Sequence, residues 1–325
     1  MSSAGEGRRM ATSKYQGVIL AAGQGSRMGP FGNRVPKPIA PICNKPLAAY
    51  QLDHFQALGI DEVFVVIGHL GHRISQTLGD GSRWGLTIQY VEQERALGLA
   101  HAVCQLEAEI NRPFVLMLGD IFFEASQLDG MVREFEEEKA AAVLAVKRET
   151  DPEALHRNFS VVLDDAGCVR RVVEKPVRAA GVLKGCGVYL FDLAIFDAIR
   201  RTPRTALRDE YELTDSIQIL IDYDLPVRAV RVIEWDMNVT FIGDLIACCR
   251  RQLRALGASE LVGEDCDIAT GAELVETVVG DRVTVGHPIR LERCVVLPDL
   301  VVAGDHDYSD RVFTEDGVFA ASDAH

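Results

Sequence analysis

In the first half of the chain, short apolar runs alternate with segments whose apolar residues recur at helical spacing. Runs of about four to eight aliphatic residues bounded by glycine or polar residues predict buried strands, and the spaced segments predict helices with one apolar face. The expected order is strand 18–22, helix 46–58, strand 62–67, helix 73–78, strand 86–91, helix 99–110 and strand 114–118. This alternation favours a Rossmann-like, mixed α/β fold, in which a mostly parallel sheet is covered by helices on both faces.

The second half is richer in short strands, which we expect at 141–146, 160–163, 169–173 and 185–191, before a helix over 241–256. Beyond that helix, aliphatic residues recur at every sixth position. One column holds Val279, Val285, Leu291 and Leu297, and a second holds Val283, Ile289, Val295 and Val301. A period of six predicts a left-handed parallel β-helix, of which this stretch would form little more than one coil. Two irregular hairpins are the alternative.

These patterns divide the chain into three regions. We expect a disordered polar leader over residues 1–14, an α/β domain over 15–257 and the short left-handed β-helix over 258–325. The leader has no apolar core, so we expect neither a signal peptide nor a membrane anchor. So short a β-helix needs a surface to pack on, either the preceding domain or a neighbouring subunit, and a homo-oligomer is therefore expected.

Composition narrows the partners and the compartment. A formal charge of −14 argues against nucleic acid and against an anionic membrane, because either would repel such a surface. The eight cysteines include no Cys-x-x-Cys pair, and neither they nor the eight histidines have the spacing of metal ligands. We therefore expect reduced thiols in a cytoplasmic protein.

The stretch after the first strand concentrates groups that bind phosphate. Gly23 and Gly25 end the apolar run, and at a glycine the backbone itself can approach a ligand. Arg27 then adds a planar fork of donors and Lys37 a mobile positive charge. This combination suits a triphosphate that is cleaved between its α and β phosphates.

Two commoner glycine-rich loops fit this stretch less well. A dinucleotide-binding loop would have a third glycine where Met28 stands and an acidic residue about twenty positions later, but residues 40–50 contain no acid. A P-loop would close with Gly-Lys and then Ser or Thr, which do not follow Gly25. A structural turn with two incidental charges is the remaining alternative.

The run Ala-Ala-Gly-Gln-Gly-Ser-Arg-Met at 21–28, with Pro-Lys-Pro at 36–38, resembles the signature of the sugar-nucleotide nucleotidyltransferases. The resemblance implies Mg²⁺-dependent transfer of a nucleotidyl group from an NTP, with dTTP or UTP favoured, to a sugar-1-phosphate similar to glucose-1-phosphate, with release of pyrophosphate. It also implies catalytic roles for Arg27 and Lys37. The nucleotide would be bound by Ala21, Ala22, Gly23 and Gly25.

Further stretches resemble other motifs of this family. Gln93 and Gly98 lie in a stretch similar to the base-reading loop, and would bind the nucleotide. In Val-Glu-Lys-Pro at 173–176, Lys175 would act as a third catalytic cation on the sugar phosphate, and Glu174 would hold sugar hydroxyls. The sugar-phosphate pocket would be completed by Ser160, Tyr189 and Thr214.

The resemblance also implies a Mg²⁺ site. Asp120 ends an apolar strand in Leu-Gly-Asp and is similar to the Gly-Asp that binds the metal in this family. The second ligand is open: counting back from Asp244 without a gap selects Asn238, whereas matching the tryptophan of the family motif selects Asp236. We prefer Asn238, because a gap beside a packed helix is costly to assume, although a charged Asp236 would be the chemically stronger ligand.

Two departures from the family pattern keep other functions open. Phe159-Ser160 stands where relatives commonly carry Tyr-Gly, and Gly-Cys-Gly at 185–187 stands where enzymes for N-acetylated sugars carry Asn-Thr-Gly. One alternative is a CTP-dependent cytidylyltransferase acting on choline phosphate or an inositol phosphate. Another is a non-catalytic regulatory protein that binds a nucleotide. Binding alone would not require Arg27, Lys37, Asp120 and Lys175 all to be present.

Overall fold

The computed structural model describes residues 13–176, 183–206 and 209–321. The leader expected to be disordered lies outside this part of the chain, apart from its last two residues. The centre of the described structure is a nine-stranded sheet with the order β10-β9-β11-β6-β1-β4-β5; β8 also pairs with β11, and β12 pairs with β8. Its strands are β1 (Gln16–Ala21), β4 (Glu62–Ile67), β5 (Thr87–Glu92), β6 (Phe114–Leu118), β8 (Ala142–Arg148), β9 (Phe159–Leu163), β10 (Val169–Glu174), β11 (Leu183–Phe191) and β12 (Val227–Val230).

The two halves of this sheet differ in strand direction. β1 runs parallel to β4 and β6, and β4 runs parallel to β5, as the alternation of strands and helices predicts. β11 instead runs antiparallel to β6, β8 and β9, and β9 runs antiparallel to β10. The prediction of a mixed, Rossmann-like α/β fold is thus confirmed. The carboxyl ends of the parallel strands meet at one edge, where such sheets bind ligands.

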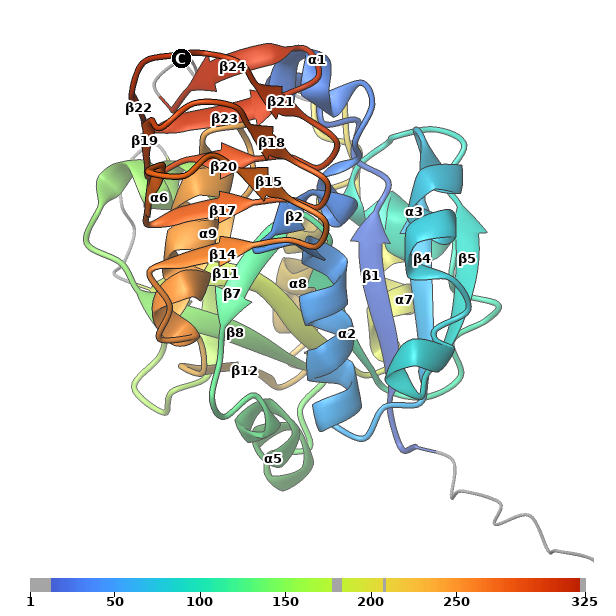
Figure 1. The fold of residues 1–325 in the computed structure, drawn as a ribbon. Coiled ribbons are helices and arrows are strands. Elements are labelled where there is room, and N and C mark those ends of the chain that lie inside the picture. Colours follow the sequence, from blue (N-terminus) through green and yellow to red (C-terminus); the bar gives the residue numbers. More distant parts are fainter. Residues whose placement is uncertain (1–12, 177–182, 207–208, 322–325) are drawn as a thin grey trace, which may run out of the picture.

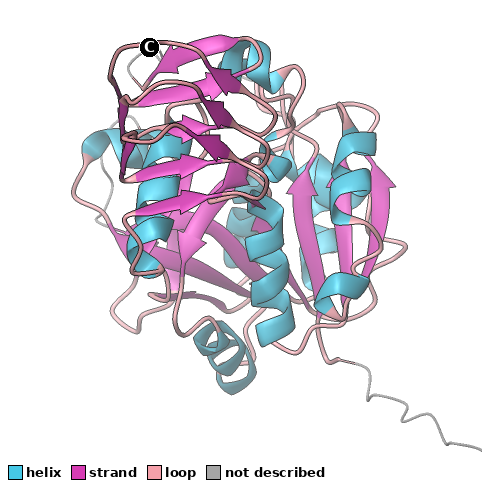
Figure 2. Cartoon of the chain, viewed as in Figure 1, coloured by secondary structure: helices cyan, strands magenta, loops and turns pink. Residues whose placement is uncertain are grey.

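Helices cover both faces of the sheet (Figure 2). Val18 packs in a core cluster with α4, α7 and α8, and its neighbour Ile19 packs in a second cluster with α2, α3 and α5. The helices are α2 (Leu47–Ala57), α3 (Gly71–Leu78), α4 (Leu99–Cys104), α5 (Asp129–Glu137), α6 (Pro152–Arg157), α7 (Ala194–Arg201), α8 (Leu213–Asp222) and α9 (Asp244–Ala255). None of the helices in the described residues is long and apolar enough to cross a membrane.

The helix predicted over 99–110 is shorter than expected. α4 ends at Cys104, and the chain continues in tighter turns, in which Leu106 N–H donates to Val103 O and Glu109 N–H donates to Leu106 O. Leu106 and Ile110 remain buried, so the apolar pattern was correct although the helical geometry was not.

Short elements line the ligand-binding edge. After β1 come the 3₁₀ turn η1 (Ser26–Met28), the single-turn helix α1 (Gly29–Gly32), the 3₁₀ turn η2 (Lys37–Ile39) and the hairpin of β2 (Pro41–Ile42) and β3 (Lys45–Pro46). After β6, the strand β7 (Ile121–Glu124) forms a two-stranded antiparallel ribbon with β13 (Trp235–Asn238). A further 3₁₀ turn, η3 (Ser82–Trp84), precedes β5.

Beyond α9 the chain forms a three-sided parallel β-helix (Figure 1). One side stacks β14 (Glu260–Val262), β17 (Thr277–Val279), β20 (Val295–Val296) and β23 (Arg311–Thr314), the second stacks β15 (Asp267–Ile268), β18 (Thr284–Val285) and β21 (Val301–Val302), and the third stacks β16 (Glu273–Val275), β19 (Arg290–Glu292) and β22 (Tyr308–Ser309). A last strand, β24 (Gly317–Ala320), folds back antiparallel on β23.

The prediction of little more than one coil was wrong, because three strands or more stack on every side. Stacked side chains lie 17 residues apart, as in the ion pair of Arg282 with Asp299, so each coil contains one step of five residues among steps of six. Because of the five-residue step, Val296 and not Leu297 points into the β-helix. On the next strand of the chain Val302 is buried and Val301 is 70 % exposed. The first coil was missed because steps of six back from Val279 and Val283 reach Glu273 and Thr277, which are polar.

One side of the β-helix packs on the α/β domain, one of the two expected surfaces. Val278, Val295 and Val312, on three successive coils, share an apolar cluster with Leu245 and Leu253 of α9. The next residue along each strand, Val279, Val296 or Phe313, belongs to the separate small core of the β-helix. The β-helix is therefore attached along its length rather than only at the chain connection.

Candidate active site

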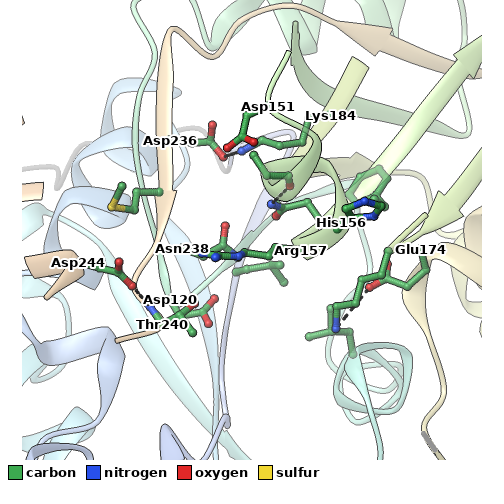
Figure 3. A pocket seen from close by; sticks show the side chains of 18 of the residues that line it. Asp120, Asp151, His156, Arg157, Glu174, Lys184, Asp236, Asn238, Thr240 and Asp244 are labelled. Carbon is green, nitrogen blue, oxygen red and sulfur yellow. Dashed lines mark hydrogen bonds and ion pairs between the residues drawn. The ribbon is translucent and has the colours of Figure 1, made fainter. Parts of the chain in front are cut away.

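A cleft of about 760 Å³ opens at the carboxyl end of β6 and extends across β11 to the end of β10. In Figure 3, Asp120, Asn238 and Thr240 lie on one side of this cleft, and His156 and Glu174 lie on the other. Predicted site residues from five separate stretches line it: Arg27, Asp120, Glu174, Lys175, Tyr189, Asp236 and Asn238. The fold thus brings together residues more than 200 positions apart in the chain.

The glycine-rich loop leaves β1 at this edge. Gly25 has a φ of 65°, a conformation that favours glycine, and starts the turn that places Arg27 on the cleft. A Cβ at Gly23 would meet no protein atom within 4 Å, so the space beside this residue is open to a ligand. Ala21 closes the buried strand, and Ala22 is half-buried after it.

Lys37 and Asp120 form an ion pair at the base of the loop. The Lys37 side chain is almost fully buried, whereas about a third of the Asp120 side chain remains exposed, and Lys37 Nζ lies 3.3 Å from Asp120 Oδ2. Lys37 starts η2, and Asp120 follows the end of β6 after Gly119. Asp120 lines the cleft and Lys37 does not, so the charge of Lys37 lies directly behind a carboxylate that the cleft exposes.

Asn238 lies next to Asp120, whereas Asp236 is engaged elsewhere. The N–H of Val239 donates to Asp120 O at 2.8 Å, and Asn238 is paired with Ile121 across the β7–β13 ribbon. Two residues earlier on the same strand, the side chain of Asp236 is fully buried between two lysines.

The two lysines come from neighbouring strands of the main sheet. Lys147 of β8 and Lys184 of β11 are directly opposite one another, an arrangement in which like charges repel. Lys147 Nζ lies 2.7 Å from Asp236 Oδ1, and Lys184 Nζ donates to Asp236 Oδ2 at 2.6 Å. Asp236 thus neutralises a buried pair of cations, and each of its oxygens is ion-paired with one of the two lysines.

Across the cleft, Glu174 and Lys175 end β10. Lys175 has a φ of 43°, and its N–H donates to Asn158 O, so a tight turn directs this residue to the cleft. Its Nζ lies 3.9 Å from Glu174 Oε1, and the hydroxyl of Thr214 donates to Glu174 Oε2 at 3.3 Å. The predicted Glu174, Lys175 and Thr214 therefore form one cluster.

Tyr189 and Ser160 lie deeper than the other acceptor-side residues. Tyr189 is stacked between Phe159 and Phe191, with ring centroids 5.9 Å and 5.5 Å away, and burial together with the charge of Glu174 raises the pKa of its hydroxyl. Ser160 is fully buried, does not line the cleft and lies opposite Lys184 in the sheet. Its hydroxyl has no hydrogen-bond partner among the described residues.

Gln93 and Gly98 lie outside the cleft lining. The amide of Gln93 contacts His101 Nδ1 at 2.9 Å, and the side chain is buried. Gly98 has a φ of 103°, and a Cβ there would lie 2.5 Å from Tyr211 O. The glycine is therefore required for close packing of the 97–100 loop on Tyr211, whatever it also offers to a nucleotide.

Sequence reasoning missed several cleft residues. Asp151, His156 and Arg157 flank or belong to the short helix α6, which no pattern predicted. Lys184 had a signal, since it is a charged residue that opens the strongly apolar strand β11. Asp244, used only as a reference point for alignment, lines the cleft and accepts hydrogen bonds from the N–H groups of Thr240 and Phe241.

Comparison with known proteins shows the family to which this chain, with its cleft at the edge of an α/β sheet, belongs. Residues 16–236 match the family model described as nucleotidyl transferase. The chain belongs to this family, and is accordingly a nucleotidyltransferase.

Two relatives show how far the similarity extends. A glucose-1-phosphate thymidylyltransferase from Streptomyces griseus is 32 % identical over 299 residues, which cover 89 % of this chain and 82 % of the relative. A nucleotidyltransferase of low-salt glycan biosynthesis from Haloferax volcanii is 32 % identical over 267 residues, covering 81 % and 73 %. The solved structure of a UDP-glucose pyrophosphorylase with UDP-glucose shares the fold, with a TM-score of 0.65 at 21 % identity over 74 % of this chain and 99 % of that one.

Proposed function

We propose that this protein transfers a nucleotidyl group from an NTP, with dTTP or UTP preferred, to a sugar-1-phosphate similar to glucose-1-phosphate, forming an NDP-sugar and pyrophosphate. The proposal is carried by one observation: Arg27 of the glycine-rich loop and Asp120, the partner of Lys37, line the same cleft as Glu174 and Lys175 at the end of β10. A triphosphate on the loop side would then meet a phosphorylated acceptor on the Lys175 side. The relatives named glucose-1-phosphate thymidylyltransferase support the choice of acceptor.

Each residue has a defined task in this reaction. A phosphate oxygen of the acceptor attacks the α-phosphorus of the NTP, and the bond to the β-phosphate oxygen breaks as pyrophosphate leaves. Arg27 and Lys37 stabilise the negative charge that grows on the phosphate oxygens. Lys175 holds the attacking phosphate, and Glu174 with Thr214 orients the sugar. No general base is required, because the attacking phosphate is already ionised at neutral pH.

The residues beside the loop fit a Mg²⁺ ion. Asp120 offers an exposed carboxylate oxygen and Asn238 an amide oxygen, both of the hard type that Mg²⁺ prefers. Asp236 is a poor candidate for the second ligand, because both of its oxygens already neutralise lysines. When bound, the ion would neutralise phosphate charge, and we assign it to Asp120 and Asn238.

Pyrophosphate release tests the proposal directly. Purified protein with Mg²⁺ is given each of five NTPs together with glucose-1-phosphate, choline phosphate or an inositol phosphate. Release with dTTP or UTP and glucose-1-phosphate is expected from the wild type and from Lys14→Ala, which removes an exposed ion pair with Glu136 before the start of β1, at the end of that strand away from the cleft. Release only with CTP and a phosphorylated alcohol, or nucleotide binding without any release, would overturn the proposal.

A further inference from the structure

The loop between Arg27 and Lys37 is tied to the far end of the chain. Arg34, in the middle of this loop, donates from Nη1 to Glu315 Oε2 at 2.7 Å, and its Nη2 lies 2.7 Å from Asp316 Oδ1. Both acids lie in the turn between β23 and β24 (Figure 1). We call residues 311–321, which include both strands and this turn, the terminal hairpin. One guanidinium is thus held by two carboxylates on the last coil of the β-helix.

The turn that presents the two acids is itself well defined. The hydroxyl of Thr314 accepts a hydrogen bond from the N–H of Asp316 at 3.0 Å and donates to Gly317 O at 3.3 Å. The strands on either side are paired in register, with Phe313 opposite Val318. The carboxylates of Glu315 and Asp316 are therefore presented by a rigid support rather than by a free chain end.

Apolar packing holds the same two segments together. Met28 and Phe31, from η1 and α1, are buried in the cluster that includes Val312 of β23, and Phe319 of β24 packs against that cluster. Figure 1 accordingly shows α1 beside β24 at one end of the molecule. The terminal hairpin also packs closely on the loop that leads into α9, because a Cβ on Gly243 would lie 2.6 Å from Ala321 O.

The loop has few other restraints between its two cations. Backbone hydrogen bonds at its tip are local, from the N–H groups of Arg34 and Val35 to Phe31 O. One longer contact is recorded, in which Arg73 of α3 donates to Arg34 O at 2.7 Å. The ion pairs of Arg34 are therefore the polar contacts that fix the tip of this loop to the β-helix, and the bond from Arg73 fixes it to α3.

We propose that the terminal hairpin is a clamp on the phosphate-binding loop, in which Glu315 and Asp316 act through Arg34 to position Arg27 and Lys37 for the triphosphate. Arg34 does not line the cleft, so it is a positioning residue and not a catalytic one. The effect on catalysis rests on the proposed function. An ion pair this exposed contributes little to overall stability, so the clamp acts on the local geometry of the loop.

The test removes the charges of the clamp without changing its shape. In the double variant E315Q/D316N we expect kcat/KM for the NTP to fall about tenfold, because small displacements of charge-stabilising groups are costly, while the KM of the acceptor and the thermal midpoint stay unchanged. The matched control is D299N, which removes the carboxylate of another exposed arginine pair on the β-helix, that of Arg282. The charge-swapped variant R34E/E315K/D316K is expected to recover most of the lost activity.

A second measurement does not depend on turnover. Hydrogen exchange of the amides in 26–37 should become faster in E315Q/D316N and stay unchanged in D299N, since only the former releases the loop. If the wild type released no pyrophosphate but exchange still responded, the proposed function would fail and the clamp would stand. Unchanged exchange in 26–37 together with an unchanged kcat/KM for the NTP would overturn the clamp.

Discussion

Substituting asparagine for Asp236 tests the buried charge cluster beneath the cleft. The side chains of aspartate and asparagine have nearly the same shape, so Asp236→Asn removes one negative charge and leaves Lys147 and Lys184 opposite each other. Breaking a buried ion pair by removing one partner costs about 3–5 kcal/mol, because the remaining charge stays buried. Lys147 is also 3.3 Å from Glu149 and slightly exposed, so we expect the lower end of that range, about 3 kcal/mol.

The dependence on pH gives a second signature of the same cluster. Burial alone lowers the pKa of Lys147, but the hydrogen bond and charge of Asp236, with a smaller contribution from Glu149, outweigh it and raise the pKa above the ordinary value of 10.5. A pKa raised by folding means that the stabilisation is complete below the unfolded-state value and is lost as the pH rises through the folded-state value. Wild-type protein should therefore lose stability above about pH 10.5, and Asp236→Asn should lose less.

Urea unfolding followed by circular dichroism measures the free energy of unfolding at neutral pH and in this alkaline range. The slope against urea should be the same for both proteins, so that the difference in midpoint reports stability. Asp129→Asn, which breaks an exposed pair with Arg133 on α5, is the control and should change the free energy by less than about 0.5 kcal/mol. A variant Asp236→Asn as stable as the wild type would show that the two lysines do not depend on this carboxylate, and would refute the reasoning.

Three further predictions concern the cleft and the thiols. Lys37→Ala should lower kcat by about a hundredfold or more, because a preorganised charge is lost in the transition state. Lys175→Ala should mainly raise the KM of the acceptor. Equal effects of the two substitutions in steady-state kinetics would contradict these roles. Asn238→Asp should lower the Mg²⁺ concentration needed for half-maximal pyrophosphate release by about tenfold, since a second carboxylate binds the cation more strongly, and an unchanged Mg²⁺ titration would argue against Asn238 as a ligand. Because five of the eight unpaired cysteines are buried, a thiol reagent should modify at most three in the folded protein and all eight in urea; rapid modification of a fourth would show that the core opens. The three candidates are Cys104, Cys168 and Cys266.

The parallel half of the sheet could be predicted because its signals are local. Each buried strand there is a continuous aliphatic run, and β1 and β4 were predicted to within a residue or two of their observed bounds. The β-helix was recognised by its period but undercounted, since a step of five residues shifts the inward position from Leu297 to Val296. Periodicity thus identifies a repeat more reliably than it measures the length of the repeat.

The cleft was predictable where a short motif supplies several groups at once. Arg27, after the turn at Gly25, and Glu174-Lys175 line the cleft, because each motif carries its own turn. The neutralisation of Asp236 was not predictable, since its partners are 52 and 89 positions away and are selected only by the pairing of β8 with β11. Ser160 was expected at the surface of the pocket, but the side on which a strand residue faces depends on register, which no local pattern reveals.

The number of coils in the β-helix also sets how far the terminal hairpin lies from the first coil. Successive strands in a sheet are about 4.8 Å apart, so an extra coil inserted between β17 and β20 would carry the terminal hairpin that distance along the stack. Arg34 would then no longer face Glu315 and Asp316, even though every coil could still be well packed. In most repeat regions each unit contacts only its neighbours, but under the proposed clamp the number of coils also decides whether Arg34 meets its partners, and the length of the β-helix becomes part of the geometry of the cleft.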